Sequence, residues 1–367
     1  MSFELGRTVG GYEFLELLGS SNIDVAYKVR NHFSQRLEAL KVLSANSSDD
    51  REGAERFLRE IKVHARLLHP NIATFYNAAE IEGQLIMTSE LVEGITLTER
   101  FKQMGPLQWC EAVSHITQIL QALGYAHELG IIHRNVMPDT VIITADATVK
   151  LTGFGLAKSL ASPNLTQAGL VLGELKYISP EQIRGVGMDA RSDLYSVGVV
   201  LYEALTGRLP FDSRSQFQVM MDHVGAEPPP PSVVNPRVPQ EFDAIVRTAL
   251  AKDPGARFQS ADQFRARLES VTSALRSKTS SAAGSGVATD RRPQTAQPPP
   301  QRAAVVESKP RRADSDDLLP LPDTAVLVPS FCAAPATMAN RNLLILGVSS
   351  LVMIGMAVVV FLTMVRL

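Results

Sequence analysis

The feature that most constrains the fold of this 367-residue chain is a series of short motifs in a fixed order between Tyr12 and Leu275. The central stretch, His133 to Gly155, reads HRNVMPDTVIITADATVKLTGFG. The later motifs are Ser179-Pro180-Glu181, the apolar stretch DARSDLYSVGVVLYEALTGRLPF at 189–211, and DPGARF at 253–258. So many motifs in a fixed order are very improbable by chance, and together they indicate a single large domain.

Together these motifs resemble those of the eukaryotic-like Ser/Thr protein kinases, most closely the bacterial transmembrane type. His133 and Arg134 match the start of H-R-D, and Phe154 and Gly155 match the end of D-F-G. The resemblance extends from Tyr12 to about Leu275.

The resemblance implies an α+β, bilobal protein-kinase fold. The small, β-rich N-lobe is expected over about 12–90 and the large, helical C-lobe over about 91–275. Apolar spacing predicts a helix at 55–68 and a closing helix at 261–275, and a further strand is expected from Ile72 to Ala78.

A nucleotide site between the lobes follows from the same resemblance. Lys41, with Ala39 two residues before it, matches V-A-I-K, and Glu60 matches the helical glutamate that pairs with this lysine. Gly19 is the first glycine of the phosphate loop, but Asp24 replaces the third. Because backbone amides must approach the phosphates and a carboxylate repels them, the loop predicts weak nucleotide binding.

The segment SELVEG at 89–94 resembles the hinge between the lobes, with Ser89 as gatekeeper. The backbones of Glu90 and Val92 would then face an adenine. A strand that leads into a loop, with no ligand, is equally compatible with these residues.

Four positions depart from the chemistry of the family. Asn135 replaces the catalytic aspartate and Met137 the lysine two residues later. Thr140 replaces the metal-binding asparagine, and Gly153 the aspartate of D-F-G. Phosphoryl transfer needs metal ligands and a carboxylate that orients the attacking hydroxyl, so no catalytic or metal site is expected to be intact.

Three functions remain open at this point. The first is a catalytically impaired pseudokinase that acts as a signalling scaffold or binding module. The second is a weakly active or unconventional Ser/Thr kinase that transfers phosphate from ATP. The third is a nucleotide sensor that binds ATP without metal. ATP is therefore the expected ligand, bound weakly, and the four departures argue against magnesium binding.

Two structural contacts are expected within the C-lobe. Glu181 should form an ion pair with Arg257, and Asp193 should brace the backbone of the loop that begins at His133. Both expectations rest on the resemblance.

The net charge and the cysteine content limit the kinds of partner and compartment that are expected. The formal net charge is −2, so no bulk attraction to nucleic acid is implied, and none is expected as a partner. The two cysteines, Cys110 and Cys332, lie far apart in dissimilar contexts and form neither a disulfide framework nor a zinc pattern. They fit a reducing compartment.

The C-terminal part of the chain differs from the domain. Residues 276–340 are rich in Ser, Ala, Pro and Gln and predict a disordered juxtamembrane linker. Leu343 to Val365 contains no charged residue and predicts one transmembrane helix. The expected location is the membrane, through a single C-terminal anchor, with the kinase-like domain in the cytoplasm. The expected partners are other signalling proteins or active kinases.

Overall fold

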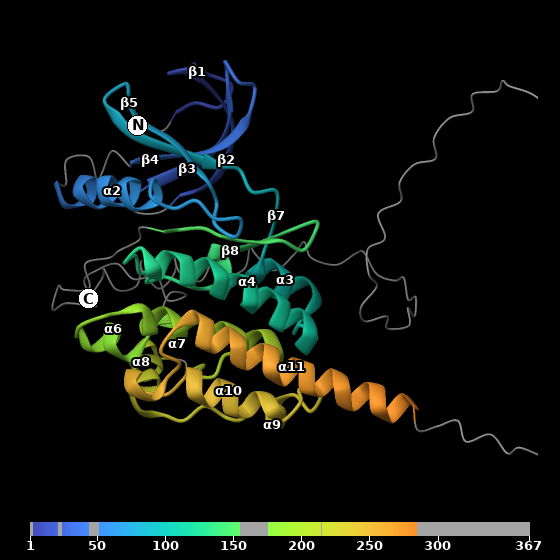
Figure 1. Cartoon of the computed structure of the whole chain (residues 1–367). Helices are drawn as coiled ribbons and strands as arrows, with labels where there is room; N and C mark the ends of the chain where they lie inside the picture. Colours follow the sequence, from blue (N-terminus) through green and yellow to red (C-terminus); the bar gives the residue numbers. More distant parts are fainter. Residues whose placement is uncertain (1–2, 21–23, 44–50, 155–174, 214, 285–367) are drawn as a thin grey trace, which may run out of the picture. The chain divides into compact units, whose positions relative to one another are not determined.

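The computed structural model describes residues 3–20, 24–43, 51–154, 175–213 and 215–284 (Figure 1). These residues form two lobes, a β-rich lobe followed by a helical one, so the predicted α+β, bilobal fold is confirmed. The predicted transmembrane segment and nearly all of the predicted linker lie outside the described residues. No described helix is long and apolar enough to span a bilayer.

Six strands of the described chain form the sheet of the small lobe, in the order β1-β2-β3-β4-β6-β5. Their bounds are β1 Thr8–Val9, β2 Tyr12–Ser20, β3 Asp24–Asn31, β4 Leu37–Leu43, β5 Phe75–Ile81 and β6 Gln84–Glu90. All neighbouring pairs are antiparallel. In β4, side chains alternate between buried and half-buried, because successive residues of a strand point to opposite faces.

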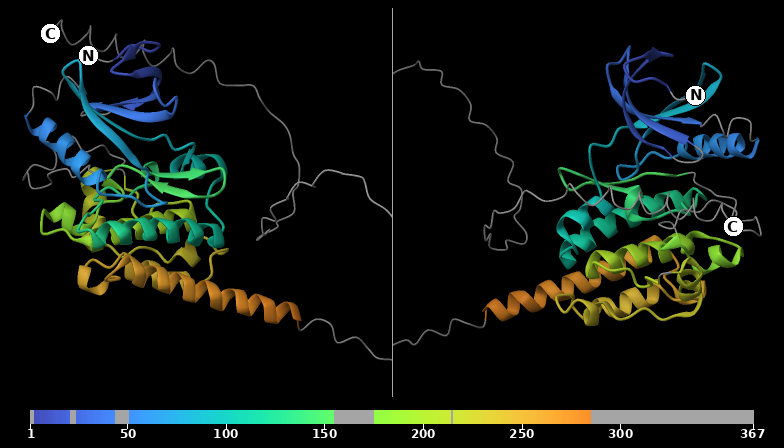
Figure 2. Two further views of the ribbon diagram at one scale, coloured as in Figure 1. Left: turned by 45° about the horizontal axis from the view of Figure 1, so that its top comes forward. Right: turned by 180° about the vertical axis from the view of Figure 1, so that it is seen from behind.

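Helix α2, Arg51–His64, packs on this sheet (Figure 2). Its buried Phe57 joins Leu43 of β4 and Met87 of β6 in a small apolar cluster. The opposite face of the sheet carries a separate core that includes Phe14, Tyr27 and Leu40. The small lobe therefore has apolar residues on both faces of its sheet.

The large lobe combines a short sheet with most of the helices. The sheet contains β7 Gly94–Thr96, β8 Val141–Thr144 and β9 Val149–Leu151. The helices are α3 Leu97–Met104, α4 Trp109–Glu128, α6 Pro180–Arg184, α7 Ala190–Thr206, α8 Gln216–Gly225, α9 Pro231–Val234, α10 Glu241–Ala249 and α11 Ala261–Gly284, with short 3₁₀ turns η1 Pro138–Thr140 and η2 Pro254–Ala256.

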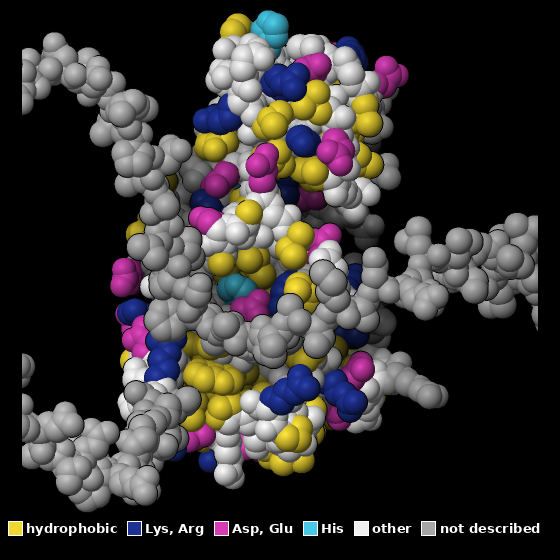
Figure 3. Space-filling view, turned by 90° about the vertical axis from the view of Figure 1, so that its right-hand side faces the viewer, with side chains coloured by type: hydrophobic (Ala, Val, Ile, Leu, Met, Phe, Trp, Pro, Cys, Tyr) yellow, Lys and Arg dark blue, Asp and Glu magenta, His cyan; other side chains and the backbone are white. Residues whose placement is uncertain are grey.

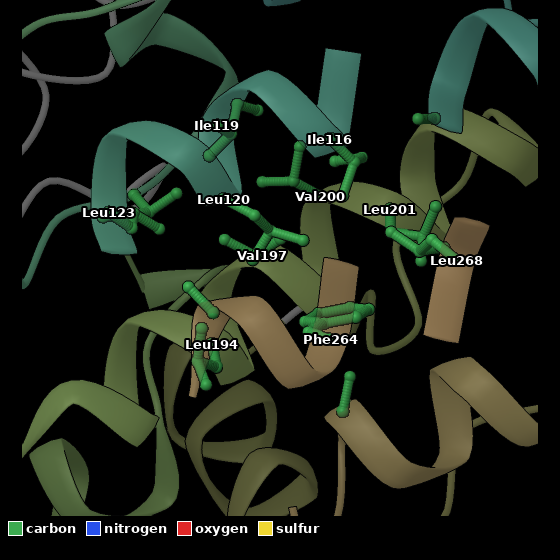
Figure 4. Packing of buried hydrophobic residues seen from close by; sticks show 14 of the residues in the cluster. Ile116, Ile119, Leu120, Leu123, Leu194, Val197, Val200, Leu201, Phe264 and Leu268 are labelled. Carbon is green, nitrogen blue, oxygen red and sulfur yellow. The ribbon is translucent and has the colours of Figure 1, made fainter. Parts of the chain in front are cut away.

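Helix α7 lies at the centre of this lobe. Figure 4 shows Leu194, Val197 and Val200 of α7 against Leu120 of α4 and Phe264 of α11, all of them buried. A helix that is apolar on nearly every side must be enclosed by others, which is how α7 is placed. Asp189 precedes the helix and caps it, because its side chain accepts from Arg191 N, and Gly207 follows the helix in the left-handed conformation.

The structure corrects the predicted boundaries of three elements. Helix α2 spans Arg51–His64 rather than 55–68. The closing helix α11 extends to Gly284, past the predicted end at Leu275, so the first residues assigned to the linker are helical. Strand β5 begins at Phe75 rather than at Ile72. Ile72 instead forms an isolated parallel bridge with Leu151 of the large lobe.

Candidate functional site

The candidate site lies where the two lobes meet, and Lys41 is its central cation. The Lys41 Nζ atom is 3.0 Å from Glu60 Oε1, so the predicted pairing of strand β4 with helix α2 is present in the structure. Burial opposes the charge of Lys41, but the carboxylates of Glu60 and Asp24 outweigh it and raise the pKa of Lys41. The lysine is therefore a permanent cation at neutral pH.

Asp24 supplies a second carboxylate beside Lys41, and no sequence motif indicates this contact. Its Oδ2 atom lies 3.6 Å from Lys41 Nζ, and its side chain is 11% exposed. The register of the sheet explains the contact, because Ala26 pairs with Lys41 and Asp24 lies two residues from Ala26 on the same face. Strand register is the signal that would have revealed it.

The other residues expected to bind nucleotide surround this group. Gly19 lies in β2 opposite Ala26, and a side chain at Gly19 would meet no atom within 4 Å. Ala39 lies in β4 opposite Ser89, the residue expected to be the gatekeeper. Residues 21–23, the middle of the phosphate loop, are outside the described residues.

Glu90 and Val92 lie in the segment that joins the lobes. The Glu90 side chain accepts from Lys150 Nζ at 2.9 Å and from Thr74 N at 3.0 Å. Burial opposes the charge of Glu90, but these hydrogen bonds outweigh it and lower the pKa of the carboxyl group. The contact with Lys150 links the joining segment to β9, and no sequence motif indicates this contact.

Asp193 holds the backbone of the loop that contains the degenerate positions. It accepts from His133 N at 2.8 Å, from Arg134 N at 2.7 Å and from His127 Nε2 at 2.7 Å. Burial opposes the charge of Asp193, but its hydrogen bond with His127 and the other donors outweigh it and lower the pKa of the carboxyl group. The expected bracing role of Asp193 is confirmed, and it stabilises Arg134 at a φ of 67°.

His133 and Phe154 pack together behind this loop. Their ring centroids are 4.5 Å apart, and both side chains are fully buried. His133 Nε2 lies 2.9 Å from the carbonyl oxygen of Thr152, and Asn135 N donates to His133 Nδ1 at 3.2 Å. Burial lowers the pKa of His133, so the ring is neutral and serves as packing and hydrogen-bonding support.

Thr140 is turned into its own loop. Its hydroxyl accepts from Met137 N at 3.2 Å and lies 2.9 Å from the carbonyl oxygen of Met137 and 3.3 Å from that of Asn135. The side chain is buried, so the hydroxyl is satisfied within the protein.

Gly153 lies beside Thr140. A Cβ atom at Gly153 would meet Thr140 Cγ2 at 3.4 Å, and the residue has a φ of +79°. Within the described parts of the chain, no group of three or more His, Cys, Asp or Glu side chains is placed to hold a metal ion. At the two positions where the family binds metal, Gly153 thus has no side chain and the Thr140 hydroxyl is hydrogen-bonded within its own loop.

Charged side chains on the outer surface are mixed. On the face shown in Figure 3, Lys and Arg side chains are interspersed with Asp and Glu side chains. The basic side chains visible there do not form one continuous patch.

Comparison with known families decides the classification. A family model described as the protein kinase domain matches residues 12–267. The chain belongs to the protein kinase family. Members of this family generally use ATP with Mg²⁺.

Two curated relatives place the domain among bacterial Ser/Thr kinases. Serine/threonine-protein kinase PrkC of Bacillus subtilis is 36% identical over 273 residues, which is 74% of this chain and 42% of that protein. Serine/threonine-protein kinase PknB of Mycobacterium tuberculosis is 40% identical over 266 residues, 71% of this chain and 42% of that protein. The chain thus spans less than half of the length of these relatives.

A solved structure agrees with the fold. The crystal structure of the Mycobacterium tuberculosis PknI kinase domain matches with a TM-score of 0.59 and 30% identity. The match covers 73% of this chain and 99% of that domain.

Proposed function

We propose that this protein is a membrane-tethered pseudokinase, in which a kinase fold acts as a signalling scaffold or binding module. The fold keeps the contacts that hold the kinase architecture, including Glu181 with Arg257 and Asp193 with the loop after His133. The groups that handle metal and phosphate are replaced. The domain is thus suited to binding rather than to phosphoryl transfer.

This proposal rests on which residues stand at the two positions where a kinase binds Mg²⁺, Gly153 and Thr140. Gly153 has no side chain, and the Thr140 hydroxyl is used by the carbonyl and amide groups of its own loop. A kinase holds Mg²⁺ with an aspartate and an asparagine at these two places, and the metal neutralises the phosphate charge. Without these ligands, the charge that develops on the transferred phosphoryl group has no metal to balance it.

Asn135 and Met137 replace two further residues that a kinase uses in phosphoryl transfer. An asparagine side chain cannot accept a proton at neutral pH, and a methionine carries no charge for the phosphoryl group. Loss of one preorganised electrostatic donor commonly slows catalysis by about a hundred- to a thousand-fold. These losses are not additive, but together they leave no efficient route.

The test is transfer of radiolabelled phosphate from ATP by the full-length chain purified in detergent, to itself and to a generic basic protein. A restored variant carries Asn135→Asp, Met137→Lys, Thr140→Asn and Gly153→Asp, and Lys41→Met is the negative control. Aspartate tolerates the left-handed conformation of Gly153 better than most residues do, so the restored loop is expected to fold.

Activity in the restored variant and none in the native chain would support a kinase fold that lacks the chemistry. Transfer by the native chain that disappears in Lys41→Met would contradict the pseudokinase proposal. It would instead favour the second candidate, an unconventional Ser/Thr kinase. The intact contact of 3.0 Å between Lys41 and Glu60 is the observation behind that candidate.

The tether and the partners are part of the same proposal. The uncharged stretch from Leu343 to Val365 is suited to span a bilayer, which would hold the domain at the cytoplasmic surface near other signalling proteins or active kinases. The full chain should then stay in the membrane pellet after carbonate washing, whereas a variant lacking 343–365 should be released. Release of both chains would contradict the tether.

A further inference from the structure

The side chain of Lys252, between α10 and the turn η2, is held beside the end of α8 in the large lobe. Its Nζ atom donates to Asp222 O at 3.2 Å and to Tyr195 Oη at 3.5 Å. It also lies 4.3 Å from the ring centroid of Phe211 and 5.7 Å from that of Tyr195. Aromatic rings and two uncharged acceptors therefore surround a half-buried amine.

The Tyr195 hydroxyl offers Lys252 only a lone pair, because its proton is used by His223. Burial lowers the pKa of His223 to about 4, so the ring is neutral near pH 7. His223 Nε2 lies 3.1 Å from Lys176 O, and a carbonyl oxygen can only accept, so the ring proton is on Nε2. His223 Nδ1 then accepts from Tyr195 Oη at 2.9 Å.

No carboxylate of the described ranges forms an ion pair with Lys252. Burial has the largest effect on the amine and lowers the pKa of Lys252 to about 8. Glu227 and Asp222 favour the charged form from beyond ion-pair distance, and the guanidinium groups of Arg257 and Arg184 oppose it. A sizeable fraction of the amine is therefore unprotonated near neutral pH.

A desolvated lysine beside other cations is the usual form of a nucleophilic amine. In its reaction with an acyl phosphate, the lone pair of Nζ attacks the carbonyl carbon, a C–N bond forms and the C–O bond to phosphate breaks. The phosphate leaves with the electron pair of that bond and takes up the proton that Nζ loses. The products are an uncharged amide and inorganic phosphate, and no other reactant is needed.

We propose that Lys252 is an acylation site, which takes its acyl group from a small acyl phosphate. The inference does not depend on the proposed function, because it concerns a side chain of the large lobe and no nucleotide. Lys252 is a cation beside the last turn of α8, where it interacts favourably with the carbonyl groups of the helix. Acylation therefore removes a charge that holds α8 to the segment before α11.

The test treats the full-length chain, purified in detergent, with acetyl phosphate between about pH 6.5 and about pH 9.5. Peptide mass spectrometry follows the acetylation of each lysine. Near neutral pH, Lys252 should react about tenfold or more faster than Lys102, an exposed lysine of α3. Its rate should level off above about pH 8, whereas that of Lys102 should still rise. Lys41, which is paired with Glu60, should react most slowly of the three.

The unfolded chain is the matched control. In guanidinium chloride, Lys252 and Lys102 should react at rates within about threefold of each other, because the fold no longer surrounds either amine. Three outcomes would overturn the inference: a rate at folded Lys252 no higher than at Lys102, a rate that does not level off, and an advantage that persists after unfolding. The proposed function is judged by phosphate transfer from ATP, so its failure and the failure of this inference are distinguishable.

Discussion

At the scale of single residues, Glu181 and Arg257 show how a buried charge is retained when it is fully paired. Arg257 donates to both carboxylate oxygens of Glu181 at 2.8 Å, and Ser192 Oγ adds a third hydrogen bond at 2.6 Å. Both charged side chains are at most 5% exposed. The predicted ion pair is therefore confirmed, and it joins α6 to the turn before α11.

The first prediction concerns the acid sensitivity of this pair. Burial opposes the charge of Glu181, but the hydrogen bonds from Arg257 and Ser192 outweigh it and lower the pKa of the carboxyl group. The unfolded chain therefore binds a proton more readily than the folded chain does. The stabilisation is complete above the ordinary pKa of 4.5 and is lost as the pH falls through the lower folded value.

Glu181→Gln leaves Arg257 buried without a counter-charge and should lower the free energy of unfolding at pH 7 by about 3–5 kcal/mol. It should also flatten the fall in stability below pH 4.5. Urea unfolding between pH 3 and pH 7 measures both effects. Glu269→Gln removes one partner of an exposed pair and should change little. Equal effects of the two substitutions would contradict the role given to the buried pair.

The second prediction concerns the backbone at Gly153. Its φ of +79° is in the left-handed region, which a side chain with a Cβ atom adopts at a cost of about 1–2 kcal/mol. Gly153→Ala should therefore lower the free energy of unfolding by about that amount. Gly187→Ala is the matched control, because a Cβ atom there meets no atom within 4 Å and no positive φ is involved. Similar losses in both variants would argue against backbone strain at Gly153.

Some of the contacts between single residues can be predicted from sequence motifs, whereas others depend on how the strands pair in the folded domain. Lys41 with Glu60, and Glu181 with Arg257, are predictable because each residue belongs to a recognisable motif. The contact of Asp24 with Lys41 is not, because it depends on which residues face each other across β3 and β4. A change of register by one residue would turn Asp24 to the other face of the sheet.

At the scale of elements, helix α2 is attached to the sheet by a few side chains. Phe57 is 1% exposed and contacts the cluster with Leu43 and Met87, and Glu60 reaches Lys41. Ile61 packs against the same cluster, and His64 Nε2 lies 2.7 Å from the carbonyl oxygen of Ala73. Phe57 is therefore one of several contacts of α2, and it contributes a fully buried aromatic side chain to the cluster.

The third prediction tests this attachment. Phe57→Ala should cost about 3–5 kcal/mol through lost burial and the cavity it leaves. Hydrogen exchange should accelerate in the amides of α2 and remain slow in α7. Leu58→Ala is the control, because the neighbouring Leu58 is 40% exposed. Unchanged exchange in α2 after Phe57→Ala would show that other contacts hold the helix.

Element boundaries are less predictable than element types, for identifiable reasons. Apolar spacing predicts α2 at 55–68, but the helix runs from Arg51 to His64. It begins earlier because Arg51 and Glu52 carry no apolar signal, and after His64 the chain continues in turns, with Arg66 N donating to Val63 O and Leu67 N to His64 O. Helix α11 continues past Leu275 into Arg276–Gly284, a stretch that lacks the apolar periodicity from which the end of the helix was predicted. Strand β5 begins late because Ala73 donates to Leu151 of the other lobe instead of pairing within the sheet.

At the scale of the whole domain, a short segment behind the hinge ties the lobes together. Asn71 Nδ2 donates to Val149 O at 2.8 Å and to Gln118 Oε1 at 3.0 Å. The backbones add two bonds, from Leu151 N to Asn71 O and from Ala73 N to Leu151 O. These contacts run from the segment between α2 and β5 to β9 and α4, so the two lobes are expected to unfold as one unit.

The last prediction follows from the buried position of Asn71. Asn71→Ala removes the Nδ2 donor from Val149 O and from Gln118 Oε1, which keeps its hydrogen bond from Val149 N, and should cost about 1–3 kcal/mol. Because the lost bonds join the lobes, calorimetry should show one transition for the native chain and a separate, earlier transition of the small lobe for the variant. Asn235→Ala removes a bond of 2.7 Å to Leu205 O within the large lobe and should lower stability while keeping one transition. A single transition in both variants would mean that the backbone bonds and the contact of Lys150 with Glu90 are sufficient to couple the lobes.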